Sequence, residues 1–200
     1  MSIGQRAVDR HYPVKARILR QGDKPDATYL LIVGRAHALT HGQDGQLVLL
    51  REYSPGDFFG AIAQAAPYPE KSDVVALEDV RVASFFALEF LALIETHGCV
   101  GVAVSRILLR QLRESADRIV ECSTLSAAGR ICAELLRLAR LGDGRSVRPA
   151  PVLAALAVRA NSTRETVSRT VNALERRGVI CREADALTIV APHRLEEMIV

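Results

Sequence analysis

The pattern of apolar residues changes near residue 88 of this 200-residue chain, so one class of secondary structure cannot account for both parts. Before that point, short apolar runs alternate partly with polar residues, and glycines at 22, 34, 45 and 56 recur every 11 or 12 residues. This spacing is typical of successive hairpins, and Asp44-Gly45 is the sharpest turn signal among them. After residue 88, apolar residues recur at helical spacing. The chain therefore predicts an α+β fold that begins with a β-roll or jelly roll.

A long helix without internal breaks is expected from about Cys99 to Ser123, after a shorter helix from Leu88 to Glu95. Apolar or small residues follow the heptad spacing 4, 3, 4, 3 along it, at Leu108, Leu112, Ser115, Ile119 and Cys122. This stripe either packs on the β half or forms a parallel two-chain coiled coil. We favour the coiled coil, because small side chains at Ser115 and Cys122 let two helices approach closely. The helix therefore predicts a homodimer.

The last third of the chain has the order helix, turn, helix, hairpin. The expected elements are a hinge at 125–129, helices over 130–141, 152–159 and 163–176, a hairpin over 179–190 and a last helix over 193–199. Pro151 suits the first turn of the second helix, and Ser162 or Thr163 is expected to cap the third. This order is that of a helix-turn-helix domain followed by a wing.

The helix over 163–176 has two different faces. At about 100° per residue, Val167, Val171 and Leu174 share one side, which can pack on a core. The opposite side carries arginines, one glutamate, and hydroxyl and amide side chains. Such a helix suits the major groove of DNA, where base edges present distinct patterns of donors and acceptors. The predicted DNA-contacting residues are Ser162, Thr163, Arg164, Glu165, Ser168, Arg169 and Asn172.

The run from Arg164 to Arg169, preceded by Leu156-Ala157, resembles the signature of the CRP/FNR transcription regulators. The stretches 21–34, 55–60 and 125–131 are similar to the family's cyclic-nucleotide-binding β-roll and hinge. This resemblance implies that Arg164 and Arg169 read guanines through a bidentate fork and that Glu165 accepts from cytosine. It also implies that Thr163 and Ser168 hold phosphates. At 152–154, however, Val-Leu-Ala stands where many relatives carry polar residues that touch phosphate.

The resemblance also implies an organisation and an activity. It divides the chain into a β-roll sensor domain at 1–98, a dimerisation helix with hinge at 99–125, and a winged helix-turn-helix domain at 126–200. The implied protein is a sequence-specific transcription regulator and not an enzyme. Its expected partners are a second copy of the chain, an inverted repeat in double-stranded DNA, and RNA polymerase.

The effector pocket departs from the pattern of relatives that bind cyclic AMP. The implied pocket positions are Phe59, Gly60, Ala61, Ile62, Lys71, Ser72 and Ser115. Where those relatives have a ribose-binding glutamate and a phosphate-binding arginine, this chain has Ala61, which cannot accept a hydrogen bond, and Lys71, which lacks the planar fork. Asp73 adds a negative charge beside the place of the anion. Ser115 matches a hydroxyl that touches the base, although a small seam residue explains it equally well. We expect a different ligand or none, with a cyclic-AMP-responsive regulator as the alternative.

No cofactor is expected. Iron–sulfur members of the family carry a cysteine cluster near the N-terminus, but the first cysteine here is Cys99. The four cysteines have no metal-ligand spacing and are interpreted as buried reduced thiols. His37 and His41 are interpreted as surface or hairpin residues, not as haem ligands.

Two rival classes remain beside the regulator. One is a jelly-roll ligand-binding or cupin-like protein, for which the β half lacks a His-x-His pair with a converging glutamate. The other is an interaction module that dimerises without reading DNA. The chain has neither a signal-peptide pattern nor an apolar run of roughly 18 residues, so it is expected to be cytoplasmic, with no membrane partner.

Overall fold

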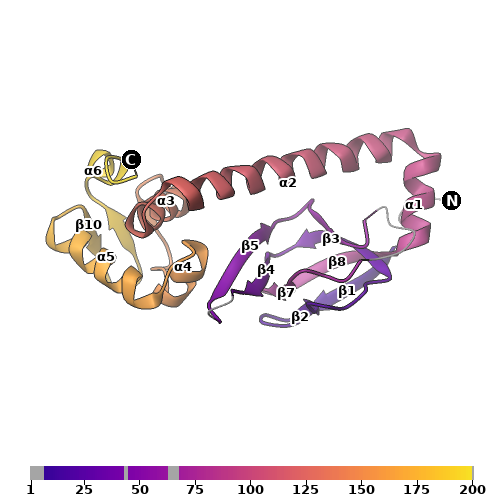
Figure 1. The fold of residues 1–200 in the computed structure, drawn as a ribbon, viewed down its shortest axis with the longest axis horizontal. Helices are drawn as coiled ribbons and strands as arrows, with labels where there is room; N and C mark the ends of the chain where they lie inside the picture. Colours follow the sequence, from indigo (N-terminus) through magenta and orange to yellow (C-terminus); the bar gives the residue numbers. More distant parts are fainter. Residues whose placement is uncertain (1–6, 43–44, 63–67, 200) are drawn as a thin grey trace. The chain divides into compact units, whose positions relative to one another are not determined.

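The computed structural model describes residues 7–42, 45–62 and 68–199, and the chain forms two compact units divided after Ser115. Strands β1 to β8 lie in the first unit, and helices α3 to α6 lie in the second (Figure 1). The division falls inside helix α2 (Gly98–Thr124), so this helix contributes residues to both units. The domain limits at residues 98 and 125 remain a prediction.

The first unit is built from two antiparallel four-stranded sheets. One has the order β1 (Val8–Tyr12), β8 (Val80–Phe86), β3 (Ala27–Val33) and β6 (Phe58–Gly60). The other has the order β2 (Arg17–Leu19), β7 (Asp73–Ala76), β4 (Ala36–His41) and β5 (Leu47–Tyr53). Residues of both sheets, among them Leu31, Val82 and Val74, share one buried core. The predicted β-roll is confirmed.

The regularly spaced glycines of this unit lie at turns between its strands. Gly34 joins β3 to β4 with φ +87°, and a Cβ atom there would lie 2.5 Å from the carbonyl oxygen of Asp79, so no other residue fits without a shift of the backbone. Strands β4 and β5 pair from Ala36 with Tyr53 to His41 with Leu47, as the hairpin signal predicts. Asp44 itself lies outside the described residues.

Two helices follow the β-roll. Helix α1 (Ala87–Thr96) is separated from α2 by His97 alone, because α2 begins at Gly98, one residue before the predicted start at Cys99. Val100, Val104 and Ile107 of α2 pack on an aromatic cluster formed by Phe58 and Phe85 of the roll with Phe90 of α1. Among the described residues, no single helix is long and apolar enough to cross a membrane. Helices α1 and α2 reach the required length and apolar composition only when they are taken together, and they are bent by 113° at their junction.

The second unit is a helical domain with a small sheet. Its helices are α3 (Ala127–Arg140), α4 (Leu153–Arg159), α5 (Arg164–Arg176) and α6 (Pro192–Glu196). Strands β10 (Ile180–Arg182) and β11 (Leu187–Ile189) form the expected hairpin, and β9 (Ser146–Val147) adds a third strand at its edge. The pattern did not indicate β9, because two residues are too short to show a period. The winged helix-turn-helix fold is confirmed.

Several predicted boundaries need correction. The hinge is shorter than 125–129, because Ser126 caps α3 by accepting a hydrogen bond from the Gly129 amide at 3.0 Å and the helix begins at Ala127. Pro151 lies before the N-cap residue Val152, outside the first turn of α4. The last helix ends at Glu196, not near 199.

Candidate functional site

Helix α5 has the two faces that its sequence predicts. Val167, Val171 and Leu174 are completely buried in the core of the second unit. Arg164, Glu165, Arg169 and Asn172 are exposed, and Ser168 is half-buried. The apolar side therefore fixes the helix while the polar side stays open to a ligand.

The start of α5 is set by Thr163. Its hydroxyl accepts a hydrogen bond from the Thr166 amide at 3.2 Å, and its backbone has the extended conformation of an N-cap. The Ser162 amide donates to the Ala157 carbonyl at 2.9 Å and belongs to the turn. Of the two predicted caps, Thr163 is the correct one.

We expect Thr163→Ala to lower the free energy of unfolding by about 1 kcal/mol, because the first turn of α5 loses an acceptor for one amide. Chemical denaturation followed by circular dichroism measures this. Ser162→Ala serves as a matched control, and a change of only a few tenths of a kcal/mol is expected for it. Equal losses in the two variants would show that Thr163 is not the cap.

The arginines expected to read bases are available. Within the part of the chain that the structure describes, the side chains of Arg164 and Glu165 make no hydrogen bond or ion pair, and the side chain of Arg169 makes a weak bond to the Thr166 hydroxyl at 3.4 Å. A guanidinium without strong partners can turn both of its terminal nitrogens toward a planar pair of acceptors. The face of α5 is therefore ready to bind without breaking internal ion pairs.

Asn172 differs from these residues, because it is tied to the wing. Arg182 of β10 donates to the Asn172 side-chain oxygen at 2.9 Å and to the Glu175 carboxylate at 3.0 Å. The hydrogen bond from Arg182 lowers the pKa of Glu175. The side-chain NH2 group of Asn172 is left to donate to a ligand. Sequence reasoning missed Arg182, because nothing in its local pattern distinguishes it from a solvent-exposed strand residue.

A polar network supports the turn before α5. The Arg130 guanidinium donates to three carbonyl oxygens, those of Ala160 at 2.9 Å, Leu125 at 2.9 Å and Asn161 at 3.0 Å. Arg118, near the end of α2, donates to the Arg159 carbonyl at 2.9 Å. Burial lowers the pKa of Arg118. The hinge and the end of α2 are thereby joined to the end of α4.

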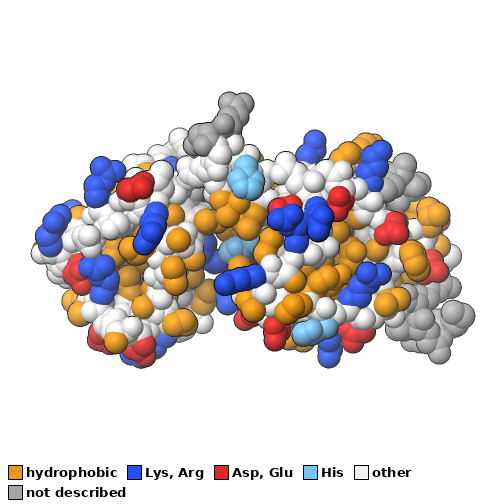
Figure 2. Space-filling model, turned by 90° about the horizontal axis from the view of Figure 1, so that it is seen from below, with side chains coloured by type: hydrophobic (Ala, Val, Ile, Leu, Met, Phe, Trp, Pro, Cys, Tyr) orange, Lys and Arg blue, Asp and Glu red, His pale blue; other side chains and the backbone are white. Residues whose placement is uncertain are grey.

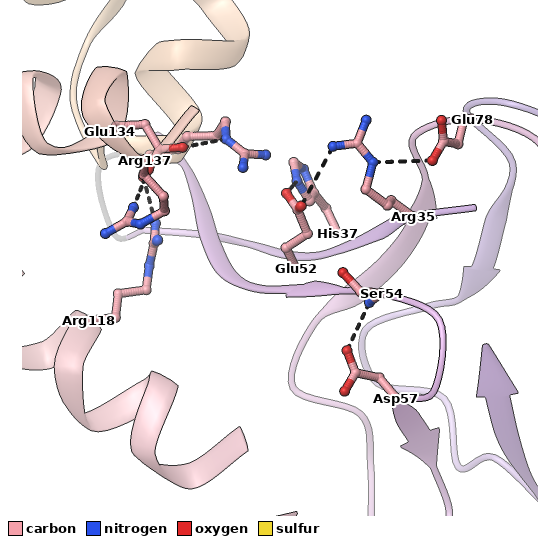
Figure 3. Close-up of polar contacts among 10 residues, drawn as sticks. Arg35, His37, Glu52, Ser54, Asp57, Glu78, Arg118, Glu134 and Arg137 are labelled. Atoms are coloured by element: carbon pink, nitrogen blue, oxygen red, sulfur yellow. Dashed lines mark hydrogen bonds and ion pairs between the residues drawn. The ribbon is translucent and has the colours of Figure 1, made fainter. Parts of the chain in front are cut away.

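Glu134 is the acid of this network, and its side chain is buried. Its carboxylate accepts from Arg159 Nε at 2.6 Å and pairs with Arg137. Figure 3 shows Glu134, Arg137 and Arg118 close together, with carboxylate and guanidinium groups facing one another. The second unit thus holds its helices together with ion pairs as well as with its apolar core.

The implied effector residues are spread over three elements of the first unit. Phe59 is buried and stacks on Tyr29 with ring centroids 5.3 Å apart. Gly60 has φ +85°, and a Cβ atom there would lie 2.6 Å from the Ala27 carbonyl oxygen. Ala61 is completely buried, and Ile62 is half-buried. Lys71 is exposed and Ser72 is buried just before β7, whereas Ser115 lies on α2.

Asp73 has a different role from the one expected. Its carboxylate accepts from the Gln21 amide at 2.8 Å and lies 3.3 Å from Arg17 Nε. Its charge is therefore used to hold β7 next to β2 and the turn that follows it. It is not a free negative charge aimed at a ligand.

Ser115 has a partner that the sequence did not indicate. Arg51 of β5 donates to the Ser115 hydroxyl at 2.5 Å, to the Gln111 carbonyl oxygen, and to the Glu114 carboxylate at 3.2 Å. The side chain of Arg51 is only 14% exposed. The structure therefore brings Ser115 together with Arg51, and no hydrogen bond among the described residues joins it to Ala61 or Lys71.

His41 is exposed on the β4–β5 hairpin, as expected, but the interpretation was wrong for His37, Cys99 and Cys181. His37 is buried, with 7% of its surface exposed, and its Nε2 lies 2.9 Å from Glu52, next to Arg35 (Figure 3). Cys99 and Cys181 are exposed, whereas of the four free cysteines only Cys132 is fully buried. Burial raises the pKa of Cys132 to about 11, which keeps that thiol protonated at neutral pH. Nowhere in residues 7–42, 45–62 and 68–199 do three or more potential metal ligands come together.

Charge alone does not mark the predicted DNA-contacting surface. The face seen in Figure 2 carries separate Lys and Arg side chains with apolar and acidic groups between them. The chain has a formal net charge of only +3. The candidate interface is therefore defined by the specific arrangement of side chains on α5 and not by net charge.

Two family models match the chain. Residues 9–97 match the cyclic nucleotide-binding domain, and residues 129–198 match the Crp-like helix-turn-helix domain. The Cyclic AMP receptor protein of Thermus thermophilus is 34% identical over 176 residues, which cover 86% of this chain and 78% of the relative. The cAMP-activated global transcriptional regulator CRP of Pasteurella multocida is 26% identical and covers 89% of this chain and 88% of its own.

Solved structures share the whole fold. A transcriptional regulator of the CRP family from Thermus thermophilus has a TM-score of 0.77 at 23% identity, with coverage of 95% of this chain and 96% of its own. The c-di-GMP responsive global regulator CLP of Xanthomonas campestris has a TM-score of 0.81 at 17% identity, with coverage of 93% and 95%. At these identities the likeness shows the fold alone.

Proposed function

The chain belongs to the CRP/FNR family of transcription regulators, and we propose that it binds an inverted repeat in DNA as a homodimer without control by cyclic AMP. The observation that carries this proposal is the polar face of α5. Arg164, Glu165 and Arg169 are exposed on a helix whose opposite face is completely buried. We further propose that the protein acts in the cytoplasm together with RNA polymerase.

The chemistry of these side chains fits base readout. The planar fork of Arg164 or Arg169 matches the N7 and O6 acceptors of guanine, and the Glu165 carboxylate can accept from the amino group of cytosine. Thr163 and Ser168 carry hydroxyls that can reach phosphates and fix the register. The turn of the wing bears Glu183, which would be repelled by phosphates, and Asp185, whose carboxylate lies 3.4 Å from Arg148. Affinity therefore depends on α5 more than on the wing.

Dimerisation is supported by the exposed face of α2. One broad face of α2 carries large apolar side chains, which are costly to expose to water. The side chains that are more than half exposed on this face are Val102, Leu109, Leu112, Ile119 and Val120. Leu108 is 39% exposed, and the predicted seam residues Ser115 and Cys122 are half-buried. The partner helix is thus expected to centre on Leu112 and Ile119.

We expect Leu112→Glu to convert the dimer into a monomer at micromolar concentration, because a carboxylate in an apolar seam would be buried without a partner. Leu112 is 65% exposed, and Leu141 in the second unit is 69% exposed, so Leu141→Glu is a matched control. Sedimentation velocity distinguishes the two species. A dimer that persists in Leu112→Glu would place the interface elsewhere.

Two groups argue against control by cyclic AMP. Ala61 offers no side-chain acceptor, and Lys71 offers a single ammonium in place of a planar fork. The relative from Thermus thermophilus that is 34% identical is named as a cyclic AMP receptor protein, so a cyclic-AMP-responsive regulator is the second candidate. The regulator from Xanthomonas campestris is described as responsive to c-di-GMP, which makes that nucleotide a second probe.

The function is tested by selecting duplexes from a random DNA library with the purified protein. The proposal expects an inverted repeat with guanine-containing half-sites, recovered equally well without nucleotide, with cyclic AMP and with c-di-GMP. Recovery of no sequence motif would contradict the regulator. Recovery only with cyclic AMP would establish the second candidate.

A further inference from the structure

The contacts of α2 change character along the β-roll. Val100, Val104 and Ile107 meet the aromatic cluster of the roll through apolar side chains. One and two turns later the residues on the same side of the helix, Gln111 and Ser115, are polar. Gln111 is 8% exposed, so this part of the helix is still covered although its side chains are polar.

The first tie between this polar part and the roll is Arg51. Its guanidinium donates to three acceptors within one turn of α2: the Ser115 hydroxyl, the Gln111 carbonyl oxygen and the Glu114 carboxylate. Ser115 in turn donates to the Gln111 carbonyl oxygen at 3.0 Å. A charge that is only 14% exposed is costly unless it is paired and hydrogen-bonded, and here all partners come from α2.

The second tie is Asp57, which follows the turn after β5. Its carboxylate accepts from Arg110 at 2.6 Å, and its other oxygen accepts from the Ser54 amide at 2.8 Å; Figure 3 shows this last contact. Gln111 donates to the Phe58 carbonyl oxygen at 3.2 Å. Both ties are made by side chains of the protein itself.

We propose that Arg51 is a positioning residue that fixes the turn 111–115 of α2 on the β-roll, so that the chain holds its DNA-binding form without a nucleotide. This inference rests on the proposed function. A ligand shifts an equilibrium only by the difference in its affinity for the two states. Arg51 already makes the contact between roll and helix and already binds the Ser115 hydroxyl. A nucleotide bound between the roll and Ser115 would therefore add little to the stability of this contact.

The test compares Arg51→Ala with Arg51→Lys and Ser115→Ala. Arg106 is exposed on α2 and makes no hydrogen bond or ion pair in the described part of the chain, so Arg106→Ala controls for the loss of one charge. Amide hydrogen exchange of residues 111–119 reports on the helix directly. Fluorescence anisotropy with the selected duplex, without nucleotide, reports on DNA binding.

In Arg51→Ala we expect faster exchange at 111–119 and DNA binding weaker by about tenfold. Arg51→Lys should recover little, because an ammonium cannot bond three acceptors in a fork. Ser115→Ala should show a smaller loss in the same direction, and it removes no buried charge, so it remains informative if Arg51→Ala fails to fold. Arg106→Ala should match the wild type.

Wild-type exchange and wild-type DNA affinity in Arg51→Ala and Ser115→Ala would overturn the inference. So would a wild-type protein whose DNA affinity rises tenfold or more with cyclic AMP or c-di-GMP. Failure of the proposed function gives a different result, since the wild type would then select no duplex, while the exchange measurement would still report whether Arg51 holds the helix.

Discussion

Replacement of both Arg164 and Arg169 by alanine is expected to weaken binding to the selected duplex by at least about 30-fold, since each bidentate contact with guanine contributes about 1–3 kcal/mol. The fold should not change, because both side chains are exposed and neither contributes to the core of the second unit. Fluorescence anisotropy at one fixed salt concentration measures the affinity, since the salt concentration alone shifts it strongly.

The matched control for this loss is Arg20→Ala, which removes an exposed arginine from the β-roll. Its affinity should equal that of the wild type. Binding of the double variant to a random duplex should fall only slightly, because that binding depends on phosphate contacts, which carry little sequence information. Equal losses on specific and random DNA would mean that the two arginines contact only phosphates.

Removal of the buried acid is expected to give the largest loss of stability. Glu134→Ala should lower the free energy of unfolding of the second unit by about 3 kcal/mol, because Arg159 and Arg137 lose a shared carboxylate in a buried place. We place the loss at the lower end of the usual range, since the Arg137 side chain is 44% exposed and stays partly hydrated. Urea denaturation followed by circular dichroism is the measurement, because the chain has no tryptophan.

Glu183→Ala is the control for this variant, since Glu183 is exposed on the wing. It should change stability by less than about 0.5 kcal/mol. A second variant, Glu134→Gln, keeps the shape of the side chain but loses the charge and should also be destabilised. If both Glu134 variants unfold at the wild-type urea concentration, the network does not hold the helices together.

The parts of the fold that depend on local patterns were predictable from the sequence. The buried side of α5 follows from the helical spacing of Val167, Val171 and Leu174, which are all completely buried. The hairpins of the β-roll follow from glycines that recur at a fixed spacing and, at Gly34, from a backbone conformation that favours glycine. Each of these two patterns can be recognised within one short stretch of the chain, without knowledge of distant contacts.

The rest depends on contacts between residues far apart in the chain. Arg51 lies 64 residues before Ser115, and Glu134 lies 25 residues before Arg159, so no local spacing indicates either pair. His37 looks like a strand-surface residue until the fold places Glu52 beside it. An isolated charged residue is exposed in most proteins, and only its partner shows why it is buried.

The central claim, that two α5 helices of a symmetric dimer read the two half-sites of one repeat, depends on the distance between those half-sites. The measurement is the affinity for the selected inverted repeat before and after insertion of about five base pairs, half a helical turn, at its centre. We predict a loss of more than about tenfold, because the second recognition helix would then face the wrong side of the duplex. Unchanged affinity would contradict the account, since it would show that each half-site is bound by a chain acting alone.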